Sequence, residues 1–264
     1  MRFCRFDEGR RGLVEAGRVY DITAATGDEL LPAPPADWRS RPARPLAEVR
    51  LLSPVRAPGK IVAAPVNYKA HILKAQALGS TMAKWPEKPE IGYRAQSALI
   101  GHEETIVKPA DYVGRFEAEP ELVAVIGRRL RRCTREEALA GIFGWTIGND
   151  VSARAWQYAD RTLWRSKNSD TFCPMGPWIT TGIDPMQSTT RVRKNGAPVA
   201  EFATGDMLFD AADYIVATAR YITLHPGDVI WMGSDGNVEM APGDTIEIEI
   251  SGIGTLRNRV IEEA

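Results

Sequence analysis

The chain has few of the residues that mark secreted, disulfide-stabilised or zinc-binding proteins. Its 264 residues include three cysteines, Cys4, Cys133 and Cys173, which are odd in number and far apart. They lack the short paired spacing of a zinc site or a disulfide framework. No uncharged segment approaches 20 residues, and the N-terminus has no apolar core of signal-peptide length. These absences predict a cytoplasmic protein that needs no covalent cross-links.

An excess of charge of one sign is also missing. The 33 basic residues nearly cancel the 34 acidic ones and leave a formal net charge of -1. This balance gives no electrostatic reason to expect nucleic acid or an anionic membrane as a partner. We therefore expect a small molecule, and a chain of this length can bury the core that a binding site requires.

The sequence shows neither a glycine-rich nucleotide loop nor the regular βαβ alternation of a doubly wound fold. Short apolar or alternating segments predict strands instead, and residues 244–250 alternate with a strict period of two. Thr134 begins a capping box that predicts a helix to about Gly141, and a second helix is expected over residues 211–221. The predicted fold class is α+β, mostly β.

The chain divides near residue 55. Residues 1 to about 25 read as a small run of strands, and residues 31–45 hold five prolines and predict a linker. The expected units are a small N-terminal β domain over residues 1–55 and a main domain over residues 56–264. Residues 67–84 show an irregular helical pattern, interrupted by glycine, that indicates a lid.

A row of glutamates precedes an apolar segment. Because side chains alternate along a strand, Glu117, Glu119 and Glu121 are expected on one face. The following residues are almost wholly apolar, so the strand enters a core. Carboxylates this close repel each other unless a cation neutralises them. The plainer alternative is a solvated strand end with surface glutamates.

Asp150 favours the cation. It ends a buried-looking strand in a cluster of polar residues, where functional groups emerge from a rigid scaffold. Hard oxygen ligands suit Mg²⁺ or Mn²⁺, with Ca²⁺ as a further candidate, rather than zinc.

Several ordered segments resemble the fumarylacetoacetate hydrolase family, in its prokaryotic acylpyruvase and oxaloacetate decarboxylase-like type. The resemblance covers roughly residues 58–264. The segments that carry it are 119–127 (Glu-Pro-Glu-Leu-Val-Ala-Val-Ile-Gly), 149–154 (Asn-Asp-Val-Ser-Ala-Arg), 167–178 (from Lys to Pro-Trp), 224–230 and 252–258.

The resemblance implies a mixed β-sandwich or β-roll main domain and a homodimer. It also implies that Glu119, Glu121 and Asp150 are the metal ligands, with Lys167 beside metal and substrate. Glu117 is the competing register, which counting back from the apolar run disfavours. Pro120 cannot donate a ladder hydrogen bond, so the strand is expected to be an edge strand or bulged at the ligands.

Members of this family cleave carbon–carbon bonds in 2,4-dioxo acids, decarboxylate oxaloacetate or isomerise related dienoates. A metal chelates the oxo-acid oxygens and stabilises an enolate, and Lys167 adds positive charge at the same place. Hydrolysis of a carbon–carbon bond is our expectation for this chain. Decarboxylation, isomerisation and a catalytically silent, metal-containing binding protein stay open as alternatives.

His71 is the candidate for activating water, since an imidazole exchanges protons near neutrality. Its alternative is a lid histidine facing solvent. Many hydrolytic members carry a glutamate three residues later, where this sequence has Lys74, which cannot accept a hydrogen bond from the ring. Either Asp235 or Glu239 supplies the missing carboxylate, or water activation is not the task of this protein.

The remaining candidates concern the substrate. Tyr68, Arg154, Gln157 and Ser234 are the candidate substrate contacts. Arg94, Arg154, Gln157 and Tyr158 could bind a distal carboxylate or carbonyl, but each could equally be a surface or structural group. His102 and His225 are expected to be ordinary surface groups.

Overall fold

The computed structural model describes residues 1–27, 29–77 and 85–264, without the side chains of residues 74 and 75. Strands hold far more of the described residues than helices do, so the predicted mostly-β, α+β class is confirmed. The described strands are β1 (Arg2–Phe6), β2 (Arg10–Glu15), β3 (Arg18–Asp21), β4 (Ala43–Pro45), β5 (Leu51–Leu52), β6 (Ile61–Ala63), β7 (Gly92–Arg94), β8 (Leu99–Ile100), β9 (Ile106–Lys108), β10 (Phe116–Ala118), β11 (Pro120–Ile126), β12 (Ile142–Asn149), β13 (Ser152–Ala153), β14 (Cys173–Thr180), β15 (Thr189–Lys194), β16 (Ala197–Ala203), β17 (Val229–Trp231), β18 (Val238–Glu239), β19 (Thr245–Ile250) and β20 (Gly254–Glu262). The described helices are α1 (Thr23–Thr26), α2 (Lys69–Ala77), α3 (Arg135–Leu139), α4 (Arg154–Ala159), α5 (Trp164–Asn168) and α6 (Ala211–Ala219), with short 3-10 turns at η1 (Trp38–Ser40), η2 (Leu46–Glu48), η3 (Gln96–Ala98) and η4 (Pro185–Gln187).

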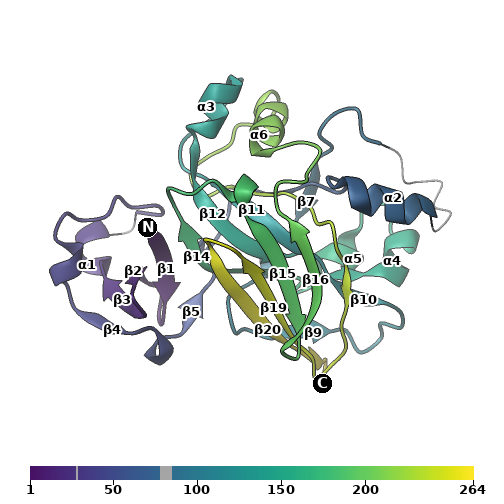
Figure 1. Ribbon diagram of the computed structural model, residues 1–264, viewed down its shortest axis with the longest axis horizontal. Coiled ribbons are helices and arrows are strands. Elements are labelled where there is room, and N and C mark those ends of the chain that lie inside the picture. Colours follow the sequence, from purple (N-terminus) through teal and green to yellow (C-terminus); the bar gives the residue numbers. More distant parts are fainter. Residues whose placement is uncertain (28, 78–84) are drawn as a thin grey trace.

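The largest sheet joins the N-terminal strands to the main body. Its strand order is β4-β3-β2-β1-β14-β12-β11-β17-β6-β7, with β5 on β1 and β8 on β14. β1 pairs antiparallel with β14, where Phe3 lies opposite Ile179. The N-terminal strands, purple in Figure 1, therefore extend the main sheet. The division at residue 55 stays a prediction, because this sheet crosses it.

The proline-rich segment is in part a strand. Ala43–Pro45 forms β4, which pairs with β3, and the Asp21 amide donates to the Pro42 carbonyl at 2.9 Å. The predicted linker is therefore wrong for residues 43–45. β4 is the outermost strand of the sheet order, a place where the missing N–H of proline is tolerated.

Two smaller sheets complete the fold. One has the order β16-β15-β19-β20-β9, and the other the order β13-β10-β18. β20 contacts β14 and β19 contacts β12, so the first of these sheets lies against the large one (Figure 1). Along β19 every second residue is buried, Ile246, Ile248 and Ile250. This alternation confirms the predicted strand and makes a mixed two-layer arrangement.

The helices lie outside the sheets. The capping box at Thr134 is present, with Glu137 as its partner. α6 ends at Ala219, two residues before the predicted end, and contacts α3. The start of the predicted lid forms α2, whereas its glycine interruption at residues 79–80 lies outside the described residues. No helix in the described part of the chain is long and apolar enough to cross a membrane.

The close packing of Gly148 against Trp231 helps to position the end of β12. β11 is buried along its whole length and pairs with β12 on one side and β17 on the other. Gly148 of β12 faces the ring of Trp231, and a Cβ at this position would lie 2.6 Å from that ring. A larger residue would separate the strands. Glycine therefore brings the end of β12, which leads into Asp150, close to the core.

Candidate metal centre

The row of glutamates is divided between two sheets. β10 ends at Ala118 and β11 begins at Pro120, so Glu117 belongs to the short sheet and Glu121 to the large one. The prediction of one strand that displays three glutamates on one face is therefore wrong. Pro120 has no N–H to donate, and the pairing of β11 with β17 begins only at Val123. At the ligands the strand is locally an edge strand, as expected.

Between β10 and β11, hydrogen bonds with Asn149 and Asp150 hold Glu119 in place of regular strand pairing. The Asn149 side-chain oxygen accepts the Glu119 backbone N–H at 3.0 Å, and the Asp150 N–H donates to the Glu119 carbonyl at 3.0 Å. These two bonds replace strand pairing and fix Glu119 beside Asp150.

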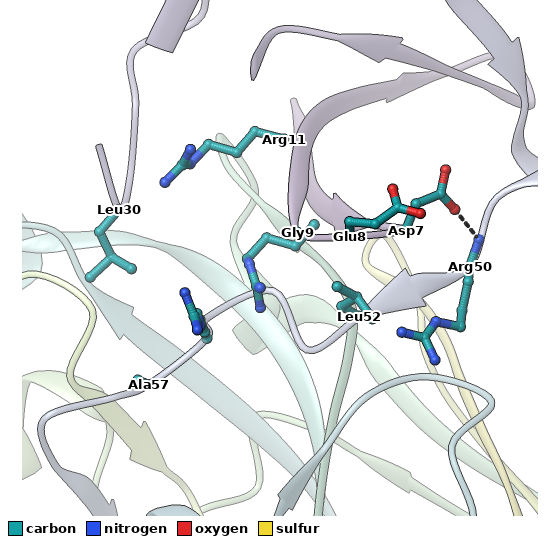
Figure 2. Close-up of a pocket in the computed structure, with 10 residues that line it drawn as sticks. Asp7, Glu8, Gly9, Arg11, Leu30, Arg50, Leu52 and Ala57 are labelled. Carbon is teal, nitrogen blue, oxygen red and sulfur yellow. Dashed lines mark hydrogen bonds between the residues drawn. The ribbon is translucent and has the colours of Figure 1, made fainter. Parts of the chain in front are cut away.

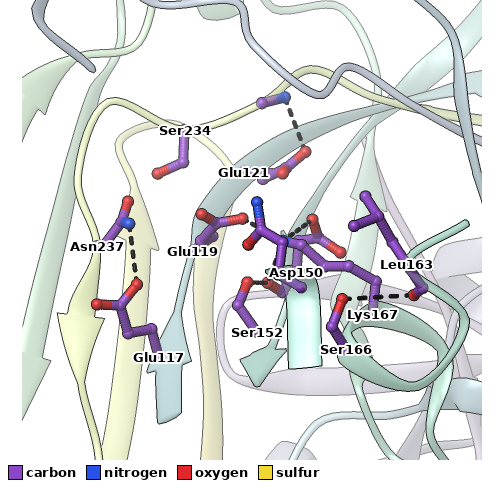
Figure 3. A network of polar contacts seen from close by, with 12 residues as sticks. Glu117, Glu119, Glu121, Asp150, Ser152, Leu163, Ser166, Lys167, Ser234 and Asn237 are labelled. Atoms are coloured by element: carbon purple, nitrogen blue, oxygen red, sulfur yellow. Dashed lines mark hydrogen bonds and ion pairs between the residues drawn. The ribbon is translucent and has the colours of Figure 1, made fainter. Parts of the chain in front are cut away.

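Three carboxylates converge here (Figure 3). One oxygen from each of Glu119, Glu121 and Asp150 lies within 4.8 Å of the others, and all three residues are buried. Glu117 lies outside this group, because its carboxylate pairs with Arg154 at 2.6 Å and accepts from Asn237 at 3.0 Å. The structure thus brings together the three predicted ligands, and Glu117, the residue of the competing register, is not among them. Their role as metal ligands stays a prediction.

Fixed cations pair with two of the three carboxylates. The Nζ of Lys167, from α5, lies 2.5 Å from both Glu119 and Asp150. Arg94 forks onto Asp150 at 2.6 and 2.7 Å, and Arg154 donates to Glu119. Burial alone would raise the pKa of Glu119 and of Asp150. For Glu119 the charges of Lys167 and Arg154 outweigh the effect of burial, so its pKa lies below the ordinary range. For Asp150 the charges of Arg94 and Lys167 have the same result.

Glu121 is different. It accepts a hydrogen bond from the Gly233 amide at 2.8 Å, and within residues 1–27, 29–77 and 85–264 no lysine or arginine is recorded in an ion pair with it. Burial, followed by repulsion from Asp150 and Glu119, raises the pKa of Glu121 well above its ordinary value. A buried carboxylate in this position requires a proton or another cation. The donor set therefore fits a divalent ion with oxygen ligands.

His71 lies on α2 near this centre. Its side chain is half-buried, and burial lowers its pKa. Glu119 and Asp235 act in the opposite direction, while Arg154 and Lys167 lower the pKa further. The imidazole is therefore neutral at pH 7 and able to accept a proton.

The two candidate partners of His71 are placed differently. Asp235 is near enough to act on the pKa of His71, and its Oδ1 atom is buried. Glu239 is exposed on β18, so Asp235 is the better placed of the two. The side chain of Lys74 lies outside the described residues, and its relation to His71 stays untested.

The predicted substrate residues fall into two groups. Arg154 pairs with Glu119 at the centre and donates to Gln157 at 2.9 Å, so Gln157 is linked to the centre only through Arg154. Tyr68 is buried and its hydroxyl donates to the Thr204 carbonyl at 2.7 Å, whereas the Ser234 hydroxyl donates to the Gly236 carbonyl at 2.8 Å. Both hydroxyls thus already have partners in the protein.

Tyr158, His225 and His102 are the remaining side chains considered in the sequence. Tyr158 is 87% exposed. His225 is exposed as expected. His102 lies in a turn with a half-buried side chain and accepts the Arg257 backbone N–H at 3.2 Å, so it is a surface group with one structural hydrogen bond.

Sequence reasoning missed two functions of charged residues. Arg94 was a candidate for a substrate carboxylate, yet it holds Asp150 and is itself buried. Glu117 orients Arg154, which in turn pairs with Glu119. The available signal was charge complementarity, since a buried strand that carries several glutamates requires arginines around it.

A family model described as fumarylacetoacetate (FAA) hydrolase C-terminal matches residues 60–261. Among curated relatives, the maleylpyruvate hydrolase of Aquipseudomonas alcaligenes is 32% identical over 285 residues, which cover 97% of this chain and 98% of the relative. The mitochondrial oxaloacetate tautomerase Fahd2a of Rattus norvegicus is 30% identical over 232 residues, covering 83% of this chain and 72% of the relative.

A solved structure agrees over the full length. The maleylpyruvate hydrolase from Sphingobium sp. SYK-6, in complex with manganese (II) ion and pyruvate, superposes with a TM-score of 0.84 at 31% identity and covers 100% of both chains. Its fold therefore includes a counterpart of the N-terminal strands as well as of the main body. The sandwich architecture that the family resemblance implied is confirmed.

Proposed function

This chain belongs to the fumarylacetoacetate hydrolase family, and on that premise we propose that it hydrolyses a carbon–carbon bond in a small 2,4-dioxo acid with the help of a divalent metal. The observation that carries the proposal is the buried group of Glu119, Glu121 and Asp150, in which Glu121 forms no ion pair with a lysine or arginine of the described residues and has a raised pKa. A similar protein of known structure holds manganese and pyruvate, which is consistent with an oxo-acid at such a centre.

Glu119, Glu121 and Asp150 would hold Mg²⁺ or Mn²⁺. When bound, the ion supplies Lewis acidity to the oxygens of an oxo-acid. Lys167 keeps its ammonium between Glu119 and Asp150, which places a fixed positive charge at the edge of the ligand set. Arg154 pairs with Glu119 and Arg94 with Asp150, so both carboxylates are held in place before any substrate arrives.

His71 takes the proton of the attacking water in this scheme. The water oxygen forms a bond to the distal carbonyl carbon, and the carbon–carbon bond beside it breaks. Its electron pair passes to the enolate of the 2-oxo acid fragment, which regains a proton at carbon. Asp235 acts on the pKa of His71 and would stabilise the imidazolium in place of the absent glutamate.

A second candidate is isomerisation or decarboxylation of an oxo-acid such as oxaloacetate. It is favoured by Lys74, which occupies the position where hydrolytic members carry the glutamate, and by the similarity to an oxaloacetate tautomerase. These reactions need the enolate-stabilising centre but no attacking water. A metal-binding protein without activity is the third alternative.

The substrate test separates these reactions. We expect the Mn²⁺-loaded protein to convert an acylpyruvate into pyruvate and a carboxylic acid, measured by loss of the enol absorbance and by coupled detection of pyruvate. Oxaloacetate serves as the second substrate under the same conditions. Consumption or tautomerisation of oxaloacetate with an intact acylpyruvate would reject hydrolysis. If neither substrate reacts although metal binds, the silent protein is the better description.

Metal binding should depend on pH. Because the pKa of Glu121 is raised, this group binds a proton in the metal-free protein that Mn²⁺ must displace. Affinity should therefore increase as the pH rises toward the pKa of Glu121, by about tenfold per unit below it. Isothermal titration at a series of pH values, each in two buffers of different ionisation enthalpy, should show proton release on ion binding wherever Glu121 is protonated in the metal-free protein. An affinity that is the same across the whole series would contradict this linkage.

A further inference from the structure

A cavity lies between the N-terminal strands and the segment that connects them to the main body (Figure 2). Its volume is about 840 Å³, and none of the metal-centre residues lines it. Arg5 of β1 and Arg11 of β2 line it from one side, and Arg50 and Arg56 from the connecting segment. We call this cavity the arginine pocket.

The described wall of the pocket carries more positive than negative charge, with four arginines against Asp7 and Glu8. None of the four arginines forms an ion pair with a carboxylate among the described residues. The two acidic residues on the wall do not compensate. Asp7 pairs with Arg44 at 2.6 Å and accepts the Arg50 backbone N–H at 3.0 Å, and Glu8 is exposed.

The guanidinium groups also keep donors available. Arg5 donates one Nη1 bond to the Ser53 carbonyl at 2.9 Å, and Arg11 donates one to the Gly27 carbonyl. A guanidinium has five N–H donors in a fixed fork. Among the described residues, most N–H donors of Arg5 and Arg11 therefore have no protein acceptor and can bind an anion.

The arginines repel one another. Burial lowers the pKa of Arg5, and the neighbouring charges of Arg56 and Arg11 lower it further. Like charges held this close disfavour the folded arrangement unless an anion lies between them. Arginine is the side chain that pairs with phosphate and carboxylate through two parallel hydrogen bonds.

We propose that the arginine pocket binds a small anion with at least two negative charges, either a phosphate compound or a polycarboxylate. The cavity has the size of a small-molecule site, and its four arginines come from β1, β2 and residues 50–56. The bound anion therefore connects the N-terminal strands to the connecting segment and stabilises their contact. This site is independent of the proposed reaction.

The test uses the full chain with pyrophosphate and, separately, citrate as probes. Each is titrated against sodium chloride of equal ionic strength, and the melting temperature and the heat of binding are measured. We expect saturable binding and a rise of about 3 °C in melting temperature at ten times the dissociation constant. Binding of pyrophosphate alone identifies a phosphate site, and binding of citrate alone a polycarboxylate site.

Matched variants separate this site from others. Arg50→Gln with Arg56→Gln removes two exposed charges of the pocket and should weaken binding at least about tenfold. Arg129→Gln with Arg259→Gln removes two exposed arginines elsewhere and should leave affinity unchanged. Since both probes also chelate metals, Glu121→Gln should retain the binding. An equal response to sodium chloride, unsaturable binding, or unchanged affinity in the pocket variant would overturn the proposal.

Discussion

Replacing Glu121 with glutamine is expected to lower kcat/KM by about 10³-fold and to abolish the rise in melting temperature that Mn²⁺ causes. The substitution keeps the size of the side chain and an oxygen for the Gly233 amide, but it removes the negative charge that a hard cation requires. In the metal-free protein, burial and the neighbouring carboxylates already raise the pKa of Glu121 and so stabilise its neutral form. The melting temperature in EDTA should therefore stay close to that of the wild-type protein.

Loss of the Mn²⁺ response with an unchanged melting temperature in EDTA would show that Glu121→Gln affects metal binding and not folding. A matched control is Glu201→Gln, because Glu201 is an exposed carboxylate that pairs with Arg191 at 2.8 Å on the surface, and it should leave activity and metal response unchanged. If Glu121→Gln retains both activity and the response to Mn²⁺, Glu121 is not a ligand. If it retains the metal response but loses turnover, its charge serves catalysis in another way.

The convergence of Glu119, Glu121 and Asp150 was predicted from the family resemblance, with the apolar segment after Glu121 as the fixed point for counting. Asp150 was predictable because a buried-looking strand ends just before it. In the structure these features correspond to β11 and β12, which pair over their length and bring both ends to one place. Strand pairing itself therefore carries the ligands together.

The break at Glu119 was harder to predict. Alternation along one strand places three glutamates on a face, but Pro120 and the side-chain bond from Asn149 divide the segment between two sheets. That bond joins residues 30 positions apart in the chain, and local periodicity carries no information on such a contact. The ion pair of Arg94 could not be predicted for the same reason, since its partner Asp150 is 56 residues away.

The N-terminal region shows a similar limit. Prolines at positions 42 and 45 indicate irregular chain, yet β4 forms there because an outer strand needs few amide donors. Whether a strand lies at the edge of a sheet depends on the whole topology. The sequence predicted the strands of this region and not their continuation into β14.

Replacing Lys167 with methionine should give the opposite pattern to the Glu121 variant. The ammonium lies 2.5 Å from two buried carboxylates, and its removal leaves them with one cationic partner each, Arg154 and Arg94. Removal of one member of a buried ion pair costs about 3 kcal/mol or more. We expect a loss of this size in the free energy of unfolding, measured by urea denaturation in EDTA.

Mn²⁺ should restore much of that stability, because the ion supplies positive charge to the same carboxylates. Activity should nevertheless stay about 10²-fold or more below wild type, since the fixed charge beside the enolate is gone. Lys108→Met is the control, because its partner Glu262 is half exposed and the pair contributes less than about 1 kcal/mol. Turnover near the wild-type rate in the Mn²⁺-loaded Lys167 variant would mean that this lysine serves only to hold the ligands together. The two variants therefore divide the centre into a group needed for the metal and a group needed for the reaction.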